Sequence, residues 1–273
     1  MKTSVRTGSY QPGEGAALDG ELDRLDAQAA LSWPEELRVL TELGVRDGQA
    51  VLDAGCGSGA FAARLRVAWP ASRLTALDAS EVLLGHARRR LSELTAADAL
   101  TMVVAGDLAD PPVADASQDA VLSRFVFQHL PDPLAVAARL RRVLRPGGLL
   151  AIIEVDAGLW GTAEPDMSAG YAEAYQAMAE EQANGGGDRF IARRLPGLLE
   201  AAGYRDVVVR PYAYGGAITP ALAAQLSPER FAPLVARGTL SLTAYARAYA
   251  AWEQFRKRRG RVMLLGFVVC GRA

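Results

Sequence analysis

The sequence predicts an α/β fold in which helices cover both faces of a parallel sheet. From Gln49 onward, short apolar segments of strand length alternate with longer segments of helical pattern, as expected for a buried parallel sheet. Half of the 273 residues are hydrophobic and 22% are charged, so a sizeable core can form. The length suits one α/β domain with additions.

Seven strands and five helices account for the alternating region. Strands are expected at residues 50–53, 74–78, 101–105, 120–125, 149–155, 206–211 and 261–270. Helices are expected at residues 60–69, 80–94, 132–145, 168–182 and 191–202. The third of these helices begins with an Asp132 cap followed by a proline, and a Pro-Gly-Gly turn at 146–148 precedes the fifth strand.

Three further segments lie outside the alternating pattern. Residues 20–31 have a helical pattern, and Ser32, Pro34 and Glu35 predict a second helix that starts with a capping box and ends at Gly44. The glycine-rich start predicts an N-terminal lid over residues 1–31. Residues 32–273 then form one domain, with cap insertions at about 157–188 and 219–259.

Charge and cysteine content exclude several classes of protein. The net charge is −1, so nothing in the overall charge favours nucleic acid or an anionic membrane surface. Cys56 and Cys270 are the two cysteines and form no metal-binding spacing. The apolar runs are too short to span a bilayer, and no signal peptide is evident at the start. We therefore expect a cytoplasmic protein.

The segment VLDAGCGSG, residues 51–59, joins a buried strand to a helix. Its glycines allow a tight turn and a close approach of the backbone to a ligand. Dinucleotide-binding enzymes use a similar loop, but here the spacing is G-x-G-x-G and Asp53 lies two residues before Gly55. A carboxylate at that position would repel phosphates and suits an ammonium group, directly or through water.

Two more acidic residues end the next two strands. Asp78 ends the second strand, 19 residues after Gly59, where an acidic side chain can accept both hydroxyls of a ribose. Asp107 ends the third strand and can accept from an adenine amino group. Each acid alone has a structural explanation, as a helix-terminal acid, a cap or a turn former. Together, at three successive strand ends, they fit a ligand with an amine, a ribose and an adenine.

These motifs resemble those of class I S-adenosylmethionine-dependent methyltransferases, in particular the small-molecule enzymes of quinone and secondary-metabolite pathways. The resemblance continues through DAVLSRFVFQHL at 119–130 and LRPGG at 144–148, and covers about residues 30–155. It implies a Rossmann-like, doubly wound, seven-stranded sheet of order 3-2-1-4-5-7-6 with an antiparallel seventh strand. It also implies S-adenosylmethionine as cofactor and a small-molecule acceptor; a homodimer is left open.

The resemblance assigns a role to each cofactor-binding residue. The methionine part lies against Asp53 and the loop, and the ribose and adenine follow along the strand ends. Arg124 lies where the fourth strand approaches the amino-acid moiety. The residues concerned are Asp53, Gly55, Cys56, Gly57, Gly59, Asp78, Ala79, Asp107, Leu108 and Arg124.

Methyl transfer from a sulfonium is an in-line displacement, for which positioning can supply most of the acceleration. A weakly acidic acceptor also needs a base. His129, Asp156 and Tyr10 are the candidates, and His129 can equally be a pocket-lining or helix-stabilising residue. No metal site is expected.

Three other functions use a similar fold or glycine loop. A protein of this fold can bind the cofactor and catalyse another reaction, such as a cyclisation. A nicotinamide-dependent oxidoreductase is disfavoured by Asp53 and by the loop spacing, and an RNA methyltransferase by the neutral charge. The acceptor and the atom methylated, O, N or C, stay open.

We predict that S-adenosylmethionine and S-adenosylhomocysteine bind with low-micromolar or tighter affinity and that NAD does not bind, because Asp53, Asp78 and Asp107 suit an amine, a ribose and an adenine. Isothermal calorimetry checks this. Binding of NAD without binding of adenosylhomocysteine would falsify the cofactor assignment.

Overall fold

The structure is a computed structural model that describes residues 9–10, 16–94 and 100–273. Much of the predicted N-terminal lid therefore lies outside the described residues. The described chain forms one eight-stranded sheet with helices on both sides. The strands are β1 (Ala50–Ala54), β2 (Arg73–Asp78), β3 (Thr101–Ala105), β4 (Gln118–Arg124), β5 (Leu144–Glu154), β6 (Gly161–Glu164), β7 (Arg205–Ala217) and β8 (Arg261–Arg272).

The strand order confirms the predicted topology. The order runs β3-β2-β1-β4-β5-β8, and β7 pairs along the other edge of β8. With β7 as the predicted sixth strand and β8 as the antiparallel seventh, this is the order 3-2-1-4-5-7-6. The sheet has one strand more than predicted, because β6 from the first insertion pairs with residues 261–264 of β8.

The helices are distributed over the two faces and a cap. They are α1 (Ala16–Glu42), α2 (Ala60–Ala68), α3 (Glu81–Leu94), α4 (Pro133–Val143), α5 (Ser168–Asn184), α6 (Leu195–Ala201), α7 (Pro220–Leu226), α8 (Ala232–Ala236) and α9 (Leu242–Lys257). Short 3₁₀ helices are η1 (Phe127–His129), η2 (Ile191–Arg193) and η3 (Pro228–Phe231). Asp132 caps α4 as predicted, since its side chain accepts from the backbone of Ala135 at 2.9 Å.

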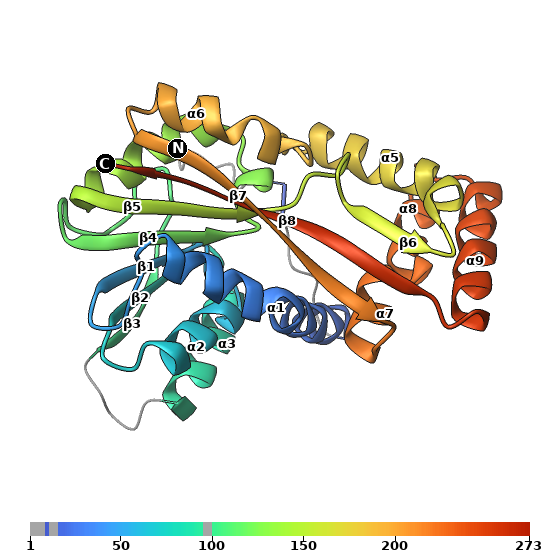
Figure 1. The fold of residues 1–273 in the computed structure, drawn as a ribbon, viewed down its shortest axis with the longest axis horizontal. Coiled ribbons are helices and arrows are strands. Elements are labelled where there is room, and N and C mark those ends of the chain that lie inside the picture. Colours follow the sequence, from blue (N-terminus) through green and yellow to red (C-terminus); the bar gives the residue numbers. More distant parts are fainter. Residues whose placement is uncertain (1–8, 11–15, 95–99) are drawn as a thin grey trace, which may run out of the picture.

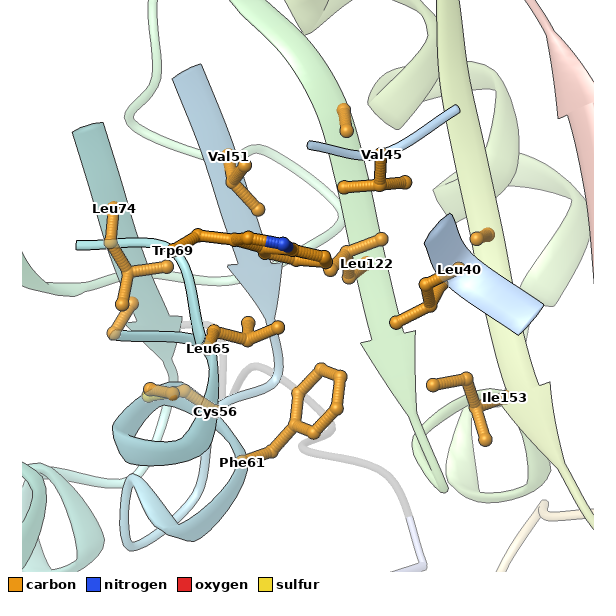
Figure 2. Close-up of a cluster of buried hydrophobic side chains, with 14 of the residues drawn as sticks. Leu40, Val45, Val51, Cys56, Phe61, Leu65, Trp69, Leu74, Leu122 and Ile153 are labelled. Atoms are coloured by element: carbon orange, nitrogen blue, oxygen red, sulfur yellow. The ribbon is translucent and has the colours of Figure 1, made fainter. Parts of the chain in front are cut away.

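Each face of the central sheet buries its own hydrophobic cluster. Successive side chains of β1 point to opposite faces of the sheet. Val51 packs with α1, α2 and α3 on one face, and Leu52 packs with α4 and α6 on the other. Figure 2 shows the first cluster, where Phe61 and Leu65 of α2 point toward the strands. All five residues of β1 are buried, as expected for a central parallel strand. The carboxyl end of β1 is thereby held rigidly.

The two insertions form a cap with a hydrophobic cluster of its own. Figure 1 shows β7 and β8 extending beyond the central strands toward α5, α8 and α9. Tyr171 of α5, Phe231 of η3 and Trp252 of α9 are buried together there. The expected helical, aromatic character of residues 219–259 is confirmed. Trp252 is a core residue, as the helical spacing of the aromatics indicates.

Two predicted boundaries differ from the structure because of prolines and a bulge. The helix expected at 191–202 is divided into η2 and α6, since Pro196 lacks an N–H and suits only the first turn of a helix. Strand β5 begins at Leu144, before the predicted Pro-Gly-Gly turn. Its pairing moves from Leu144 opposite Gln118 to Leu149 opposite Ala120, so the turn bulges out of the strand.

The prediction of two N-terminal helices is wrong, because α1 runs without interruption through Ser32 and Pro34. The Ser32 side chain does not cap a new helix; its hydroxyl donates to Glu36 Oε1 at 2.7 Å. Pro34 removes the helical donor for the carbonyl of Ala30, an exposed residue whose carbonyl can bond water instead. The expected lid boundary at residue 31 thus falls inside one helix.

A buried ion pair fixes α1 against the sheet. Arg124 at the end of β4 donates through Nε to both carboxylate oxygens of Glu36, at 3.1 and 2.9 Å. Glu36 is fully buried and the Arg124 side chain is 7% exposed. The Tyr212 hydroxyl of β7 donates to Glu36 at 3.1 Å. Burial alone would lower the pKa of Arg124, but the charge of Glu36 raises it, so the guanidinium stays charged.

We expect Glu36→Gln to lower the free energy of unfolding by about 3–5 kcal/mol, because it leaves the buried guanidinium of Arg124 without a counter-ion. The neighbouring Glu35→Gln is the matched control: Glu35 pairs with Arg38 at 3.0 Å on the surface, and its loss should cost less than about 1 kcal/mol. Urea unfolding of the two variants checks this. Equal destabilisation would show that the buried pair does not hold α1 in place.

Candidate active site

A cavity of about 870 Å³ lies at the carboxyl ends of β1 to β5. Open α/β sheets bind ligands at this edge. All residues expected to bind the cofactor line the cavity except Gly59. The remaining walls come from α1, η1 and the cap, through α5, η3 and α8. The acidic residues at the strand ends and residues of the insertions thus line a single cavity.

The glycine loop after β1 lets the backbone come close to a ligand in the cavity. Gly55 has φ +86°, and a Cβ atom there would lie 2.5 Å from a methyl group of Val126, so only glycine fits. The backbone N–H groups of Gly55 and Cys56 both donate to the carbonyl of Leu77, at 2.8 and 2.9 Å. Burial, with a contribution from Asp53, raises the pKa of the Cys56 thiol. Cys56 is a small lining residue and not a nucleophile.

Asp53 is a buried carboxyl group with an unmet hydrogen-bonding capacity. It is 1% exposed, and its Oδ2 atom has no hydrogen-bond partner among the described residues. Burial, followed by the nearby charge of Asp78, raises its pKa to about 8. A buried acid without a partner is costly for the fold. The group is suited to a cationic ligand, which would favour its charged form.

Asp78 at the end of β2 connects the loop to α3. Its Oδ2 accepts from the backbone of Gly57 and its Oδ1 from the backbone of Ser80, both at 2.8 Å. Burial raises the pKa of Asp78, while these backbone donors lower it. The neighbouring Ala79 lines the cavity as well. Asp78 is held in place by backbone donors and is still half-buried at the cavity wall.

Asp107 and Leu108 follow β3 and complete the acidic side of the cavity. Asp107 Oδ1 accepts from the backbone of Ala109 at 2.8 Å, which is the turn-forming role open to it from sequence. Leu108 is 7% exposed and belongs to the cluster under α4. The three acids at the ends of β1, β2 and β3 therefore face one cavity.

Arg124 lines the cavity, but within the described chain its side chain donates to α1: to Glu36, to the Ser32 hydroxyl and to the carbonyl of Gln28. Its guanidinium lies 4.2 Å from the ring centroid of Phe125. Phe125 has the left-handed φ of 58° directly after β4, a strained conformation for a bulky residue. Sequence reasoning missed Phe125, because no local pattern signals backbone strain.

His129 lies in the same cavity beside the N-terminal segment. Its Nδ1 and the Ser9 hydroxyl are 2.9 Å apart, and the Tyr10 ring lies 5.4 Å from its ring centroid. Burial lowers the pKa of His129 to about 4, and the charges of Arg189 and Arg24 add to this. The imidazole is therefore neutral near pH 7. The Tyr10 hydroxyl donates to Glu21 at 2.8 Å, and burial raises the pKa of Tyr10, so Tyr10 is unsuited to accept a proton.

Two sequence candidates do not reach the cavity. Asp156 is 1% exposed and pairs with Arg193 at 2.5 and 2.7 Å, while also accepting from the backbone of Gly158. It fixes the start of the first insertion and is not placed to act as a base. Gly59 lies at the start of α2, where a Cβ would be 3.0 Å from Ala87 of α3. Its lack of a side chain serves helix packing.

Arg24, Arg189 and Arg230 line the cavity on the side of α1 and the cap. Sequence reasoning missed them, because arginine is so abundant in this chain that no single one stands out. These arginines line the same cavity because segments that are distant in sequence fold against each other. Among the described residues, no group of three or more histidine, cysteine, aspartate or glutamate side chains is arranged to hold a metal ion.

Comparisons with known proteins identify the kind of domain to which this cavity belongs. Residues 52–152 match the family described as "Methyltransferase domain". The chain is 32% identical over 199 residues to an uncharacterised 37.1 kDa protein in a transposon of Streptomyces fradiae, covering 72% of this chain and 55% of that one. It is 36% identical over 140 residues to a ubiquinone/menaquinone biosynthesis C-methyltransferase of Paracoccus denitrificans, covering 50% and 51%.

A malonyl-[acyl-carrier protein] O-methyltransferase of Xylella fastidiosa is 38% identical over 128 residues, covering 46% of this chain and 42% of that one. The chain thus spans about half the length of the curated relatives it matches. Among solved structures, phosphoethanolamine N-methyltransferase 2 of Haemonchus contortus, bound to phosphomonomethylethanolamine and S-adenosylhomocysteine, has a TM-score of 0.56 at 21% identity. That match covers 88% of this chain and 52% of the other and shows a shared fold.

The chain therefore carries a class I S-adenosylmethionine-dependent methyltransferase domain, and S-adenosylmethionine is its cofactor. The strand-end acids and the glycine loop lie within or beside the matched residues. Within the described ranges, the helices are too short or too polar to cross a bilayer.

We predict that Asp53→Asn raises the melting temperature of the ligand-free protein, and more at pH 8 than at pH 5. The folded-state pKa of about 8 exceeds the ordinary 3.8, so between these values the folded state holds a proton that the unfolded state has released. Stability therefore falls as pH rises through this window, and asparagine removes that loss. The gain at pH 8 should reach about 2–4 °C, the equivalent of one kcal/mol.

Thermal unfolding of the wild type, Asp53→Asn and a control, Asp110→Asn, checks this at both pH values. Asp110 is exposed and outside the cavity lining, so its variant should follow the wild type. A difference between Asp53→Asn and wild type that is the same at pH 5 and pH 8 would contradict the raised pKa.

Proposed function

We propose that this protein transfers the methyl group of S-adenosylmethionine to an O, N or C atom of a small-molecule, natural-product acceptor in the cytoplasm. One observation carries the proposal: the acids at the ends of β1, β2 and β3 open onto a single cavity that continues to the cap. A cavity walled by α1, η1 and the insertions suits a small molecule better than a polymer. The net charge of −1 gives no support for nucleic acid as the acceptor.

The residues present fit the cofactor. The partnerless oxygen of buried Asp53 suits the ammonium of the methionine part, and the open backbone at Gly55 and Gly57 leaves room for it. Asp78 would accept the ribose hydroxyls, and Asp107 with Leu108 would contact adenine. When bound, the cofactor supplies a methyl group on a sulfonium, an electrophile that needs a correctly aligned acceptor and little further activation.

The neutral His129 would orient the acceptor by hydrogen bonding. Its Nδ1 faces the Ser9 hydroxyl, which leaves the other ring nitrogen for a group in the cavity. With a pKa of about 4, the imidazole does not change charge between pH 6 and 8. Glu154 supports this loop, since its carboxyl oxygens accept from the backbone and the side chain of Gln128, both at 3.1 Å.

Closure over the cavity is part of the same proposal. The described N-terminal residues already touch the site, since the Ser9 backbone donates to the carbonyl of His129 at 3.0 Å. The insertion after β5 leaves from the cofactor side of the sheet. The described residues of segment 7–31, which are 9–10 and 16–31, would together with segment 158–187 exclude water from the reaction when the site is filled; the rest of segment 7–31 lies outside the described residues. Hydrogen exchange that is unchanged in both segments on saturation with adenosylhomocysteine would argue against closure.

The test of transfer itself uses S-adenosylmethionine with a deuterated methyl group and a panel of candidate metabolites. Mass spectrometry should find a product carrying the labelled methyl group in a one-to-one ratio with adenosylhomocysteine. Tight cofactor binding without consumption, with an acceptor converted to an unmethylated product, would instead support a non-methylating catalyst such as a cyclase.

We predict that Asp78→Ala weakens adenosylhomocysteine binding by at least about tenfold, because a charge-assisted hydrogen bond to the ribose is lost. Since Asp78 also accepts from Gly57, affinity for the 2′-deoxy analogue of adenosylhomocysteine separates the two roles. Wild type should bind the deoxy analogue more weakly than the parent, and the variant should not distinguish them.

The control for this experiment is Asp110→Ala, an exposed acid outside the cavity lining, which should keep wild-type affinity and discrimination. Circular dichroism melting shows whether each variant is folded. If the folded Asp78→Ala protein still favours the ribose over the deoxyribose, the ribose assignment fails.

A further inference from the structure

Three arginine side chains enter the cavity from its α1 and cap side. Arg24 comes from α1, Arg189 from the loop between α5 and η2, and Arg230 from η3. All three are only half-buried, and they line the cavity. The opposite side carries Asp53, Asp78 and Asp107. The cavity therefore has carboxyl groups at the strand ends and guanidinium groups beneath the cap.

The three arginines differ in their partners. Arg24 is neutralised by Glu21, which it contacts at 2.6 and 2.7 Å. Arg189 donates to the side-chain oxygen of Gln182 at 2.9 Å, and Arg230 to the carbonyl of Gln225 at 2.5 Å. Both of these acceptors are neutral. Among the described residues, neither Arg189 nor Arg230 has a carboxylate within 4.0 Å.

Other acids near the cavity do not neutralise the pair. Glu21 is engaged by Arg24 and by the Tyr10 hydroxyl. Glu229 is exposed and accepts from the Tyr249 hydroxyl at 3.3 Å. Both carboxyl oxygens of Glu154 are engaged by Gln128, through its backbone and its side chain, each at 3.1 Å, and burial raises the pKa of this carboxyl group. Two positive charges thus face the same space without a fixed counter-ion.

This arrangement is unfavourable for the ligand-free protein. Burial lowers the pKa of Arg189 to about 10, and the charge of Arg230 contributes; burial also lowers the pKa of Arg230. Partly buried guanidinium groups that repel each other and have no carboxylate partner cost stability. The positions are nevertheless fixed, since Gln182 is held by the carbonyl of Gln128 at 2.7 Å. An anion between the two guanidinium groups would remove the cost.

We propose that Arg189 and Arg230 bind a carboxylate or phosphate group of the methyl acceptor. This rests on the proposed function, because the methyl group enters the same cavity from the acidic side. A guanidinium has five N–H donors in a planar fork that matches both anions. Within the described residues, each of these two arginines uses one hydrogen bond to the protein. Both come from the cap insertions, whereas the residues assigned to the cofactor follow the strands.

The alternative anion is the carboxylate of the cofactor itself. Arg24 is already paired with Glu21, so Arg189 and Arg230 would be the arginines left for that group. The experiment must therefore separate an acceptor anion from the cofactor carboxylate. Adenosylhomocysteine carries the carboxylate and 5′-methylthioadenosine lacks it, so the ratio of their affinities reports the cofactor's own anion contact.

The experiment titrates the adenosylhomocysteine-saturated protein with inorganic phosphate, with acetate and with choline in a calorimeter. We expect one phosphate or acetate to bind per chain and choline not to bind; the tighter anion indicates whether the acceptor group is a phosphate or a carboxylate. Arg189→Gln and Arg230→Gln should each weaken anion binding by about tenfold or more. The control is Arg139→Gln, which should bind as wild type does, because Arg139 is an exposed residue of α4 without an ion-pair partner in the described chain.

Absence of anion binding to the wild type overturns the proposal, as does equal binding by the two cavity variants and Arg139→Gln. A fall in the ratio of adenosylhomocysteine to methylthioadenosine affinity in the cavity variants also overturns it, by assigning the arginines to the cofactor. Failure of the wild type to bind adenosylhomocysteine would count against the proposed function, and the anion titration then runs on the ligand-free protein. If a glutamine variant does not fold, Arg189→Lys and Arg230→Lys replace it, with a smaller loss of affinity expected.

Discussion

The buried pair between Arg124 and Glu36 is the contact on which the architecture of the site depends. It joins the carboxyl end of β4 to the middle of α1, and the Tyr212 hydroxyl adds β7 to the same carboxylate. A charge pair withdrawn from water tolerates little displacement, because either partner alone would be strongly destabilising. Helix α1 is therefore held across the strand ends as one wall of the cavity. Residues Glu21 and Arg24 of this helix reach the ligand space as a consequence.

The cavity separates charge along its length, and this separation organises the proposed reaction. The acidic side has an unmatched carboxyl oxygen on Asp53, and the basic side has two arginines without a carboxylate partner in the described chain. A cationic cofactor and an anionic acceptor would each relieve an electrostatic cost that the empty protein carries. Binding would bring a sulfonium methyl and an acceptor into one enclosed space, where orientation contributes most of the rate.

The core of the fold was predictable because its signals are local. The alternation of apolar strand-length segments with helices predicts β1 to β5, β7 and β8, and the resemblance to the methyltransferase family predicts their order. Strand β3 matches its predicted range, and Asp132 caps α4 as expected. Pro34 misled the prediction at α1, since a capping-box pattern is a local preference that the tertiary contacts of Arg124 and Glu36 override.

The site residues that were wrongly predicted or missed also depend on tertiary contacts that no local sequence pattern reveals. Asp156 follows a strand end, as a catalytic residue would, but it is engaged by Arg193, 37 residues away, and no local pattern reveals that pairing. The reverse holds for Arg189 and Arg230. All but two of the 30 basic residues are arginines, so composition hid the two whose position matters. Their closeness arises where the two insertions fold together into the cap, and it required the structure.

The central claim is that the cofactor occupies the acidic side of the cavity and leaves the arginine side to the acceptor. A crystal structure with adenosylhomocysteine and phosphate or acetate tests it most directly. The account predicts the ribose at Asp78, the amino group at Asp53 and the anion between Arg189 and Arg230, with the cofactor's sulfur facing that anion across the cavity. Adenosylhomocysteine bound with its carboxylate between these two arginines, or with its ribose away from Asp78, would contradict it.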